Sequence, residues 1–202
     1  MLSNDTASLE SSRMLGSAAV APWRTRDIVV AAVIGVVFGV VFLAWQGVWG
    51  AFAFLNPIFP VLQDSVYGVW LLPAVLAPLI IRKPGAALFA EMVAAGVSAL
   101  IGSVWGVDTL LSGFVQGAAA ELIFAFTLYR TFSFPVLAVA AVASAAAAWI
   151  HDWVLYYPEV SVELQLARGV IMAASAIVFA GLGSLVIERS LRRAGVLSGF
   201  PT

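Results

Sequence analysis

Long apolar runs, separated by short polar or charged segments, fill the chain from residue 23 onward. Each run is close to the length of about 20 residues that a helix needs to cross a bilayer. The pattern therefore predicts an all-α, polytopic membrane protein with six transmembrane helices, and it places residues 23–202 in a single six-helix membrane domain. The six predicted spans are residues 28–45, 66–81, 84–102, 109–128, 134–156 and 162–187.

Two segments fall outside this pattern. The chain is polar up to Met14 and lacks the basic, apolar and cleavage-site order of a signal peptide, so residues 1–22 are predicted to be a disordered cytoplasmic tail. Residues 46–65 are rich in aromatic residues, carry no basic residue and include Pro57 and Pro60. We expect this second segment to be an outer loop or a re-entrant segment that caps one end of the helices.

The composition argues against several classes of fold and of functional site. Hydrophobic residues make up 62% of the chain and charged residues 10%, with a mean hydropathy of +1.03, whereas a soluble domain carries about 25% charged residues. This composition argues strongly against a water-soluble fold. The absence of cysteine excludes disulfides, thiolate metal sites and cysteine nucleophiles, and a single histidine argues against a multi-histidine metal site. We expect no metal and no cofactor.

The positions of the charges predict the orientation in the membrane. With six spans, most basic residues fall on one side, and the other side has Arg168 as its one basic residue. Because Lys and Arg are enriched in cytoplasmic loops, both the N- and the C-terminus are predicted to be cytoplasmic. The basic side carries Arg24, Arg26, Arg82, Lys83, Arg130, Arg189, Arg192 and Arg193, and the acidic side carries Asp64, Asp108, Glu159 and Glu163.

Three polar side chains lie at membrane depth: Glu91 in the third predicted span, and Gln116 and Glu121 in the fourth. An ionisable group in hydrocarbon is costly unless it faces a cavity or a partner, so each of these side chains marks a candidate ligand site. Gln116 and Glu121 are about 140° apart around a helix and cannot both point squarely into one small site. We expect Gln116 to contact the ligand and Glu121 to form the floor of the site or an inter-helix pair. A structural hydrogen bond between helices is the alternative role for all three.

The end of the fifth predicted span carries one helical stripe of aromatic side chains that includes a carboxylate. Trp149, Asp152, Trp153 and Tyr156 follow the spacing 0, 3, 4 and 7. Aromatic faces together with a carboxylate hold a desolvated organic cation through cation–π attraction and a counter-charge. An interfacial aromatic belt is the alternative role for the rings. His151 points away from this stripe and is expected to be a packed or interface residue.

Further aromatic residues are predicted at the same, outer end of the membrane domain. Tyr67 and Trp70 begin the second span, and Trp105 lies in the short turn between the third and fourth spans. These rings could complete a cage around the cation.

Small residues recur every four positions in the first predicted span, at Ala31, Gly35 and Gly39. Such a stripe lets another helix approach closely. Two roles remain open for it: packing inside this chain, or docking of another subunit.

Two other functional classes remain as alternatives. Glu91 and Glu121 could form the proton relay of a stand-alone secondary transporter. Ser112 and His151 invite comparison with intramembrane serine proteases, but the glycine expected two residues before the serine is Leu110. ATP binding through a phosphate-binding loop is excluded, because the only lysine, Lys83, does not lie in a G-x-x-x-x-G-K-[ST] motif.

Three motifs carry a resemblance to a known family. They are the stretch from Arg82 to Leu88, which reads Arg-Lys-Pro-Gly-Ala-Ala-Leu and is followed by Glu91; Gln116-Gly117 followed by Glu121; and Tyr67-Gly68-Val69-Trp70. With these motifs, residues 27–200 resemble the substrate-binding S components of energy-coupling factor (ECF) vitamin transporters. The resemblance is to the YkoE-like branch, which is associated with thiamine and its hydroxymethylpyrimidine precursor.

The resemblance implies a six-helix protein of the bacterial plasma membrane that captures a vitamin from outside and is not an enzyme. A transmembrane T component and two ATPase subunits would supply the energy, and the stripe of Ala31, Gly35 and Gly39 would dock the T component. Thiamine fits the candidate residues, because its thiazolium is a cation suited to aromatic rings and Asp152, and its aminopyrimidine offers groups for Glu91 and Gln116. Besides thiamine or a related pyrimidine, the T component and ATPases and the lipid bilayer, no nucleic-acid partner is expected.

Overall fold

The structure is a computed structural model, and it describes residues 22–55 and 61–201. Every regular element within these residues is a helix. The predicted tail at residues 1–22 lies outside the described residues except for Pro22. Residues 56–60, which are part of the expected outer loop, also lie outside them.

Six helical segments correspond to the six predicted spans, so the prediction of an all-α polytopic protein is confirmed. The second span is a 3₁₀ helix that continues into an α-helix, and the sixth contains a π-helical segment. Among the described residues, five segments are long and apolar enough to cross a membrane, and a shorter apolar helix of 16 residues, α4, is the sixth. The elements are α2 (Thr25–Ala53), η1 (Gln63–Leu71), α3 (Leu72–Ile81), α4 (Ala86–Ile101), α5 (Asp108–Phe126), α6 (Phe134–Leu155), α7 (Val162–Ala176), η2 (Ile177–Leu182) and α8 (Gly183–Arg193).

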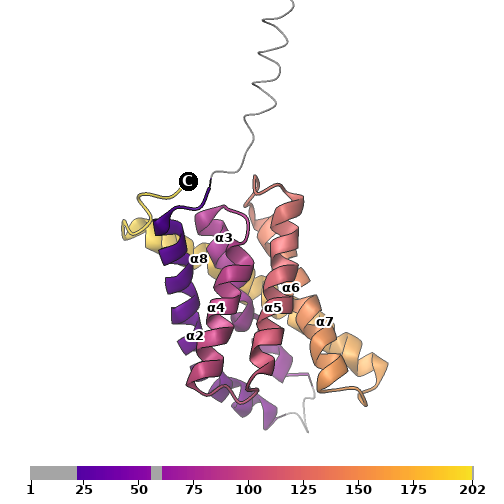
Figure 1. The fold of residues 1–202 in the computed structure, drawn as a ribbon. Helices are drawn as coiled ribbons and strands as arrows, with labels where there is room; N and C mark the ends of the chain where they lie inside the picture. The colour runs from indigo at the N-terminus through magenta and orange to yellow at the C-terminus, as the bar shows by residue number, and fades with distance from the viewer. Residues whose placement is uncertain (1–21, 56–60, 202) are drawn as a thin grey trace, which may run out of the picture.

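Figure 1 shows α2, α4 and α5 side by side, with α6 and α7 continuing the row and α3 and α8 behind them. The start of α2, the turn between α3 and α4, the loop between α5 and α6 and the end of α8 lie at one end of the molecule (Figure 1). We call this the basic end, because it brings together the helix ends that carry the predicted basic residues. The turn between α4 and α5 lies at the opposite end.

Small residues let α2 approach α4 closely. A Cβ atom at Gly35 would lie 2.6 Å from Cβ of Val93, and one at Gly39 would lie 2.6 Å from Cβ of Val97. Ala31 is fully buried on the same helix. The stripe that the resemblance assigns to docking of the T component is therefore covered by α4 of the same chain. Internal packing is the role that the structure shows for it.

The contact between α4 and α5 uses two glycines in the same way. A Cβ atom at Gly113 would lie 2.5 Å from Cβ of Ala95, and one at Gly117 would lie 3.0 Å from Cβ of Glu91. Because these glycines have no side chains, the two helices pack almost backbone to backbone. The contact brings Glu91 to the boundary between α4 and α5.

The 3₁₀ helix η1 packs directly against α7. The backbone N–H of Gly68 donates to Oγ of Ser175 at 2.9 Å, and this hydroxyl donates to the carbonyl of Ser65 at 2.8 Å. A Cβ atom at Gly68 would lie 2.3 Å from the carbonyl oxygen of Ser175, so this contact requires glycine. Residues three apart lie on one side of a 3₁₀ helix, and this periodicity places Tyr67 and Trp70 together.

The outer loop expected at residues 46–65 is shorter than predicted, because α2 continues to Ala53. Trp45 stabilises this extension by donating from Nε1 to the carbonyl of Val66 at 2.9 Å. The end of α2 is thereby fastened to η1. One further turn of α2 places Trp49 beside the rings of η1.

The residues around Lys83 form a joint at the basic end. Lys83 donates from Nζ to the carboxylate of Asp27 and to the carbonyl of Pro22. Trp23 donates from Nε1 to the carbonyl of Pro84 at 2.8 Å. These bonds connect the start of α2 to the turn between α3 and α4.

Candidate functional site

A cavity of about 700 Å³, measured with the space at its open mouth, lies at the end of the molecule opposite the basic end. Side chains from α2, η1, α4, α5 and α6, and from the turns that follow α4 and α6, line it. Among the predicted ligand-binding residues, the structure brings five together on its wall: Tyr67, Trp70, Glu91, Gln116 and Asp152.

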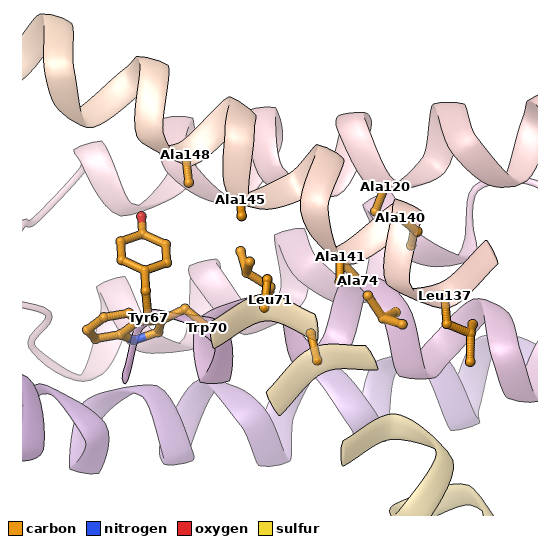
Figure 2. Close-up of a cluster of buried hydrophobic side chains, with 14 of the residues drawn as sticks. Tyr67, Trp70, Leu71, Ala74, Ala120, Leu137, Ala140, Ala141, Ala145 and Ala148 are labelled. Carbon is orange, nitrogen blue, oxygen red and sulfur yellow. The ribbon is translucent and has the colours of Figure 1, made fainter. Parts of the chain in front are cut away.

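Four aromatic rings form one wall of the cavity. Trp70 is the central ring, with its centroid 4.9 Å from that of Trp49, 5.3 Å from that of Tyr67 and 5.5 Å from that of Trp105. The rings meet edge to face, an arrangement that aromatic pairs favour. Figure 2 shows Tyr67 and Trp70 next to each other, across from the alanine-rich face of α6 that includes Ala148. We call these four rings the aromatic box.

Glu91 is a buried carboxylate on the α4 side of the cavity. Its Oε2 accepts a hydrogen bond from the backbone N–H of Ala74 at 3.1 Å. Ala74 lies in the first turn of α3, where backbone N–H groups have no partner within the helix. Ala95 and Ser98, one and two turns further along α4, also line the cavity. The same carboxylate therefore supports the fold and borders the binding space.

Gln116 connects α5 to the aromatic box. Its Nε2 donates to Oγ of Ser112 at 2.6 Å and to the hydroxyl of Tyr67 at 3.3 Å. Its backbone carbonyl accepts a hydrogen bond from Ser144 on α6 at 2.9 Å. The side chain is held in one orientation at the cavity wall, which is what selective contact with a small ligand requires.

Acidic groups from two helices flank a histidine in the cavity lining. His151 Nδ1 lies 3.0 Å from Oδ1 of Asp152, and Nε2 lies 3.2 Å from Oδ1 of Asp108. The hydroxyl of Tyr156 donates to the other oxygen of Asp108. Burial, and then this bond, raise the pKa of Tyr156 above its usual value, so the hydroxyl stays a donor at neutral pH. We call Asp108, His151 and Asp152 the carboxylate–histidine cluster.

Tyr157 closes the cavity after α6. The guanidinium of Arg168 on α7 lies 3.8 Å from the centroid of its ring, and the guanidinium itself is paired with the buried carboxylate of Asp64 on η1. Gln165 donates to the backbone carbonyl of Tyr157 at 2.7 Å. Burial raises the pKa of the Tyr157 hydroxyl, so this side chain is uncharged at neutral pH.

Glu121, a predicted ligand residue, lies outside the cavity lining. Its carboxylate accepts hydrogen bonds from the backbone N–H groups of Gly85, Ala87 and Leu88 at 2.6, 2.8 and 3.3 Å. It also accepts one from the hydroxyl of Tyr129 at 2.6 Å. Glu121 therefore caps the start of α4 from across the helix contact, which corresponds to the inter-helix alternative and uses up its acceptor capacity.

Trp149 and Trp153, also predicted ligand residues, lie outside the lining as well. Trp149 donates from Nε1 to the carbonyl of Gln165 at 2.9 Å, and a Cβ atom at Gly169 would lie 3.2 Å from its ring. The Trp153 ring packs on Trp149, with 5.2 Å between centroids. The stripe on α6 is thus divided: its tryptophans face α7, whereas Asp152 borders the cavity.

Sequence reasoning missed Asp108 and His151 as lining residues. Asp108, Ser112 and Gln116 follow a spacing of four along α5, and all three border the cavity. That spacing is a signal that could have found Asp108. His151 was expected to point away, but neighbouring residues on a helix are only about 100° apart, and a cavity wider than one side chain contacts both His151 and Asp152.

The arrangement is suited to holding a cation and unlike a hydrolytic centre. The two ring nitrogens of His151 face carboxylates, whereas Oγ of Ser112 accepts from Gln116, so the structure shows no activated serine at this pair. Within residues 22–55 and 61–201, no group of three or more His, Cys, Asp or Glu side chains is arranged to hold a metal ion. What remains is a box of aromatic rings next to buried carboxylates.

Comparisons with known proteins agree with a transport role. Residues 26–147 match the family model described as ABC-type cobalt transport system, permease component. The chain is 36% identical over 179 residues to the putative HMP/thiamine permease protein YkoE of Bacillus subtilis (strain 168), an alignment that covers 88% of this chain and 89% of YkoE.

A solved structure shows the same fold. The crystal structure of an S component of an ECF transporter superimposes with a TM-score of 0.82 and 36% sequence identity, covering 88% of this chain and 90% of that one. Such S components are multi-pass proteins of the plasma membrane that serve transport and are not enzymes. This chain therefore belongs to the family of ECF-transporter S components that includes YkoE.

Proposed function

We propose that this S component captures thiamine, or its hydroxymethylpyrimidine precursor, with high affinity from the outer side of the membrane. The observation that carries the proposal is the meeting of the aromatic box with the carboxylates of Glu91, Asp108 and Asp152 in one cavity. Rings and carboxylates together favour an organic cation over a neutral or anionic ligand.

The two ends of thiamine match two different walls. Its thiazolium ring carries a permanent positive charge, which the rings of the aromatic box and the carboxylate of Asp152 stabilise. Its aminopyrimidine offers N–H donors and ring nitrogens, which match the carboxylate of Glu91 and the amide of Gln116. The cation supplies a counter-charge to the carboxylates that border the cavity, so the ligand offsets part of the cost of burying them.

In this proposal the basic end faces the cytoplasm, with both termini, and the mouth of the cavity faces outward. The enrichment of Lys and Arg at the ends gathered there supports this orientation. A T component and two ATPase subunits supply the energy for release inside, in agreement with the absence of a phosphate-binding loop from this sequence. The stripe of Ala31, Gly35 and Gly39 plays no part in docking, because α4 covers it.

A proton-coupled transporter that works alone is less well supported. That mechanism would use Glu91 and Glu121 as a relay, but Glu121 is engaged by three backbone N–H groups and a tyrosine hydroxyl. Thiamine uptake into proteoliposomes that contain this chain alone, driven by a pH gradient, would favour it over the proposal.

Calorimetric titration of the purified protein in lipid nanodiscs tests the proposed ligand. We expect thiamine to bind with a Kd below about 1 μM, and Asp152→Asn to weaken binding by more than tenfold, as expected for a buried charge pair that loses one partner. Glu159→Gln is the matched control, because it removes an exposed carboxylate that lies seven residues away and outside the lining.

The outcomes of this titration are distinct. Tight binding of thiamine with equal affinity in both variants would remove the assignment of Asp152. No saturable binding of either thiamine or hydroxymethylpyrimidine at millimolar concentration would overturn the proposed ligand. Mass spectrometry of any small molecule that co-purifies with the protein gives an independent check.

A further inference from the structure

His151 has two carboxylates as neighbours, one on each ring nitrogen. Asp152 Oδ1 lies 3.0 Å from Nδ1, and Asp108 Oδ1 lies 3.2 Å from Nε2. A neutral imidazole has one N–H donor and one acceptor nitrogen, and an ionised carboxylate can only accept. Both contacts are therefore hydrogen bonds only when the ring carries both protons, as an imidazolium.

We propose that His151 is the internal counter-ion of Asp108 and Asp152 in the empty cavity, and that it gives its proton up when an organic monocation binds. This inference rests on the proposed function for the identity of the cation. In the exchange, the N–H bond on the side of one carboxylate breaks, the electron pair stays on the ring, and the proton leaves to bulk water through the mouth of the cavity. The ligand cation takes over the role of counter-charge.

The charges of the cluster balance in this exchange. Two carboxylates and one imidazolium carry a net charge of one negative unit in the empty cavity. After the proton has left and the cation has entered, the two carboxylates and the cation again sum to one negative unit. The aromatic box that receives the cation lines the same cavity, so the ligand binds beside the cluster that it neutralises.

The other charged groups near His151 do not neutralise Asp108 and Asp152 in its place. Asp64 and Arg168, on η1 and α7, neutralise each other. The tyrosine hydroxyls around the cavity are uncharged, and Glu91 on the α4 side is a further acid. The titratable and charged groups that face the cluster are Asp108 from α5, Asp152 from α6, Asp64 and Tyr67 from η1, Arg168 from α7, Glu91 from α4, and Tyr156 and Tyr157 after α6.

The exchange predicts the direction of the pH dependence. Proton and ligand compete for the same two carboxylates, so ligand binding strengthens as the pH rises while the empty protein is protonated at His151. For one released proton, the limit is about a tenfold gain in affinity per pH unit. Once the ring has lost its proton in the empty protein, the affinity becomes independent of pH.

The chain contains a single histidine, which makes its charge state directly measurable. Full-length protein labelled with ¹⁵N and ¹³C only in histidine, in lipid nanodiscs at pH 7, gives one set of ring signals by NMR. We expect an imidazolium without ligand and a neutral ring after saturation with thiamine. Calorimetry in two buffers of different ionisation enthalpy should show about one proton released per thiamine bound. A neutral ring in the empty protein would overturn the inference.

Variants separate this role from simple packing. His151→Gln keeps a hydrogen-bonding side chain but cannot release a proton, so its thiamine affinity should change less than twofold between pH 6 and pH 8. Glu159→Gln, the exposed control, should keep the pH dependence of the wild-type protein. An unchanged pH dependence in His151→Gln, or a ring that stays protonated with thiamine bound, would overturn the exchange while leaving the proposed function intact.

The failure of the proposed function has a different signature. In that case thiamine causes neither heat nor a change in the histidine signals, although the ring is an imidazolium in the empty protein. That result overturns thiamine as the ligand and with it the exchange, whereas the assignment of His151 as internal counter-ion then stands.

Discussion

The guanidinium of Arg168 on α7 forms a bidentate ion pair with the carboxylate of Asp64 on η1. Nε lies 3.0 Å from Oδ2 and Nη2 lies 3.2 Å from Oδ1, and both side chains are almost completely buried. The sequence places these charges on the acidic, outer side of the membrane domain, 104 residues apart. The pair fixes the 3₁₀ helix that carries Tyr67 and Trp70, and the same guanidinium supports the ring of Tyr157.

Removing one partner of this pair should be strongly destabilising. Arg168→Leu leaves the carboxylate of Asp64 buried without its partner, and we expect a loss of about 3–5 kcal/mol in the free energy of unfolding. The double variant Asp64→Leu/Arg168→Leu removes both charges and should lose less than Arg168→Leu alone. Reversible unfolding in mixed micelles measures both, and a double variant that is less stable than the single one would contradict this account.

The glycine stripe on α2 should be essential for folding. Gly35→Leu drives a side chain into Val93 and the backbone of Ala90, with Cβ alone at 2.6 and 2.8 Å from their atoms, so we expect a loss of at least about 3 kcal/mol or a failure to fold. Gly47→Leu on the same helix meets nothing within 4 Å of its Cβ and should remain stable. Thermal unfolding monitored by circular dichroism compares the two. Equal stability would mean that α2 does not pack on α4 as described.

Glu121 should contribute to stability and not to ligand affinity. Glu121→Gln replaces a carboxylate that accepts from three backbone N–H groups, and we expect a loss of about 1–3 kcal/mol. Burial, and then the bond to this carboxylate, raise the pKa of Tyr129, so its hydroxyl remains a donor at neutral pH and the wild-type contact persists. The thiamine affinity of the folded variant, measured by calorimetry, should stay within threefold of the wild-type value. A tenfold loss would indicate that Glu121 contacts the ligand.

Glu91, in contrast to Glu121, should contribute to ligand affinity and much less to stability. Glu91→Gln keeps an oxygen that can accept from Ala74 but replaces the carboxyl group at the cavity wall, so thiamine affinity should fall by more than tenfold while the fold persists. Trp153→Phe is the control, because its ring packs on Trp149 and does not line the cavity. An equal effect of both changes on the Kd would indicate a general loss of structure and would contradict a ligand role for Glu91.

The spans could be predicted because hydrocarbon imposes one simple requirement, a continuous apolar helix of sufficient length. The same requirement makes Glu91 and Gln116 conspicuous, and the structure places both at the cavity. The direction of a helix face is harder to predict, because it depends on which neighbour lies nearest. Trp149 faces α7 because Gly169 leaves room for its ring, and nothing in the sequence of α6 alone indicates that neighbour.

The Arg-Lys-Pro-Gly-Ala-Ala stretch illustrates the same limit. Lys83 binds Asp27, and the N–H groups of Gly85 and Ala87 bind Glu121, so most of its interactions hold helix ends together at the basic end. The motif carries the resemblance to the family, but the contacts that it makes in this structure do not reveal the ligand site. Glu91, one turn further along α4, is the residue that borders the cavity.

The shortness of α4 has a consequence for how the ligand arrives. Its 16 residues rise about 24 Å, less than the hydrocarbon thickness of about 30 Å. The apolar side chains of Leu100, Val104 and Val107 at its end are more than three-quarters exposed, and they extend the lipid-facing surface beyond the helix. We therefore expect acyl chains to border the entrance beside Trp105 on this flank, and bilayer thickness to alter the rate at which the proposed ligand enters.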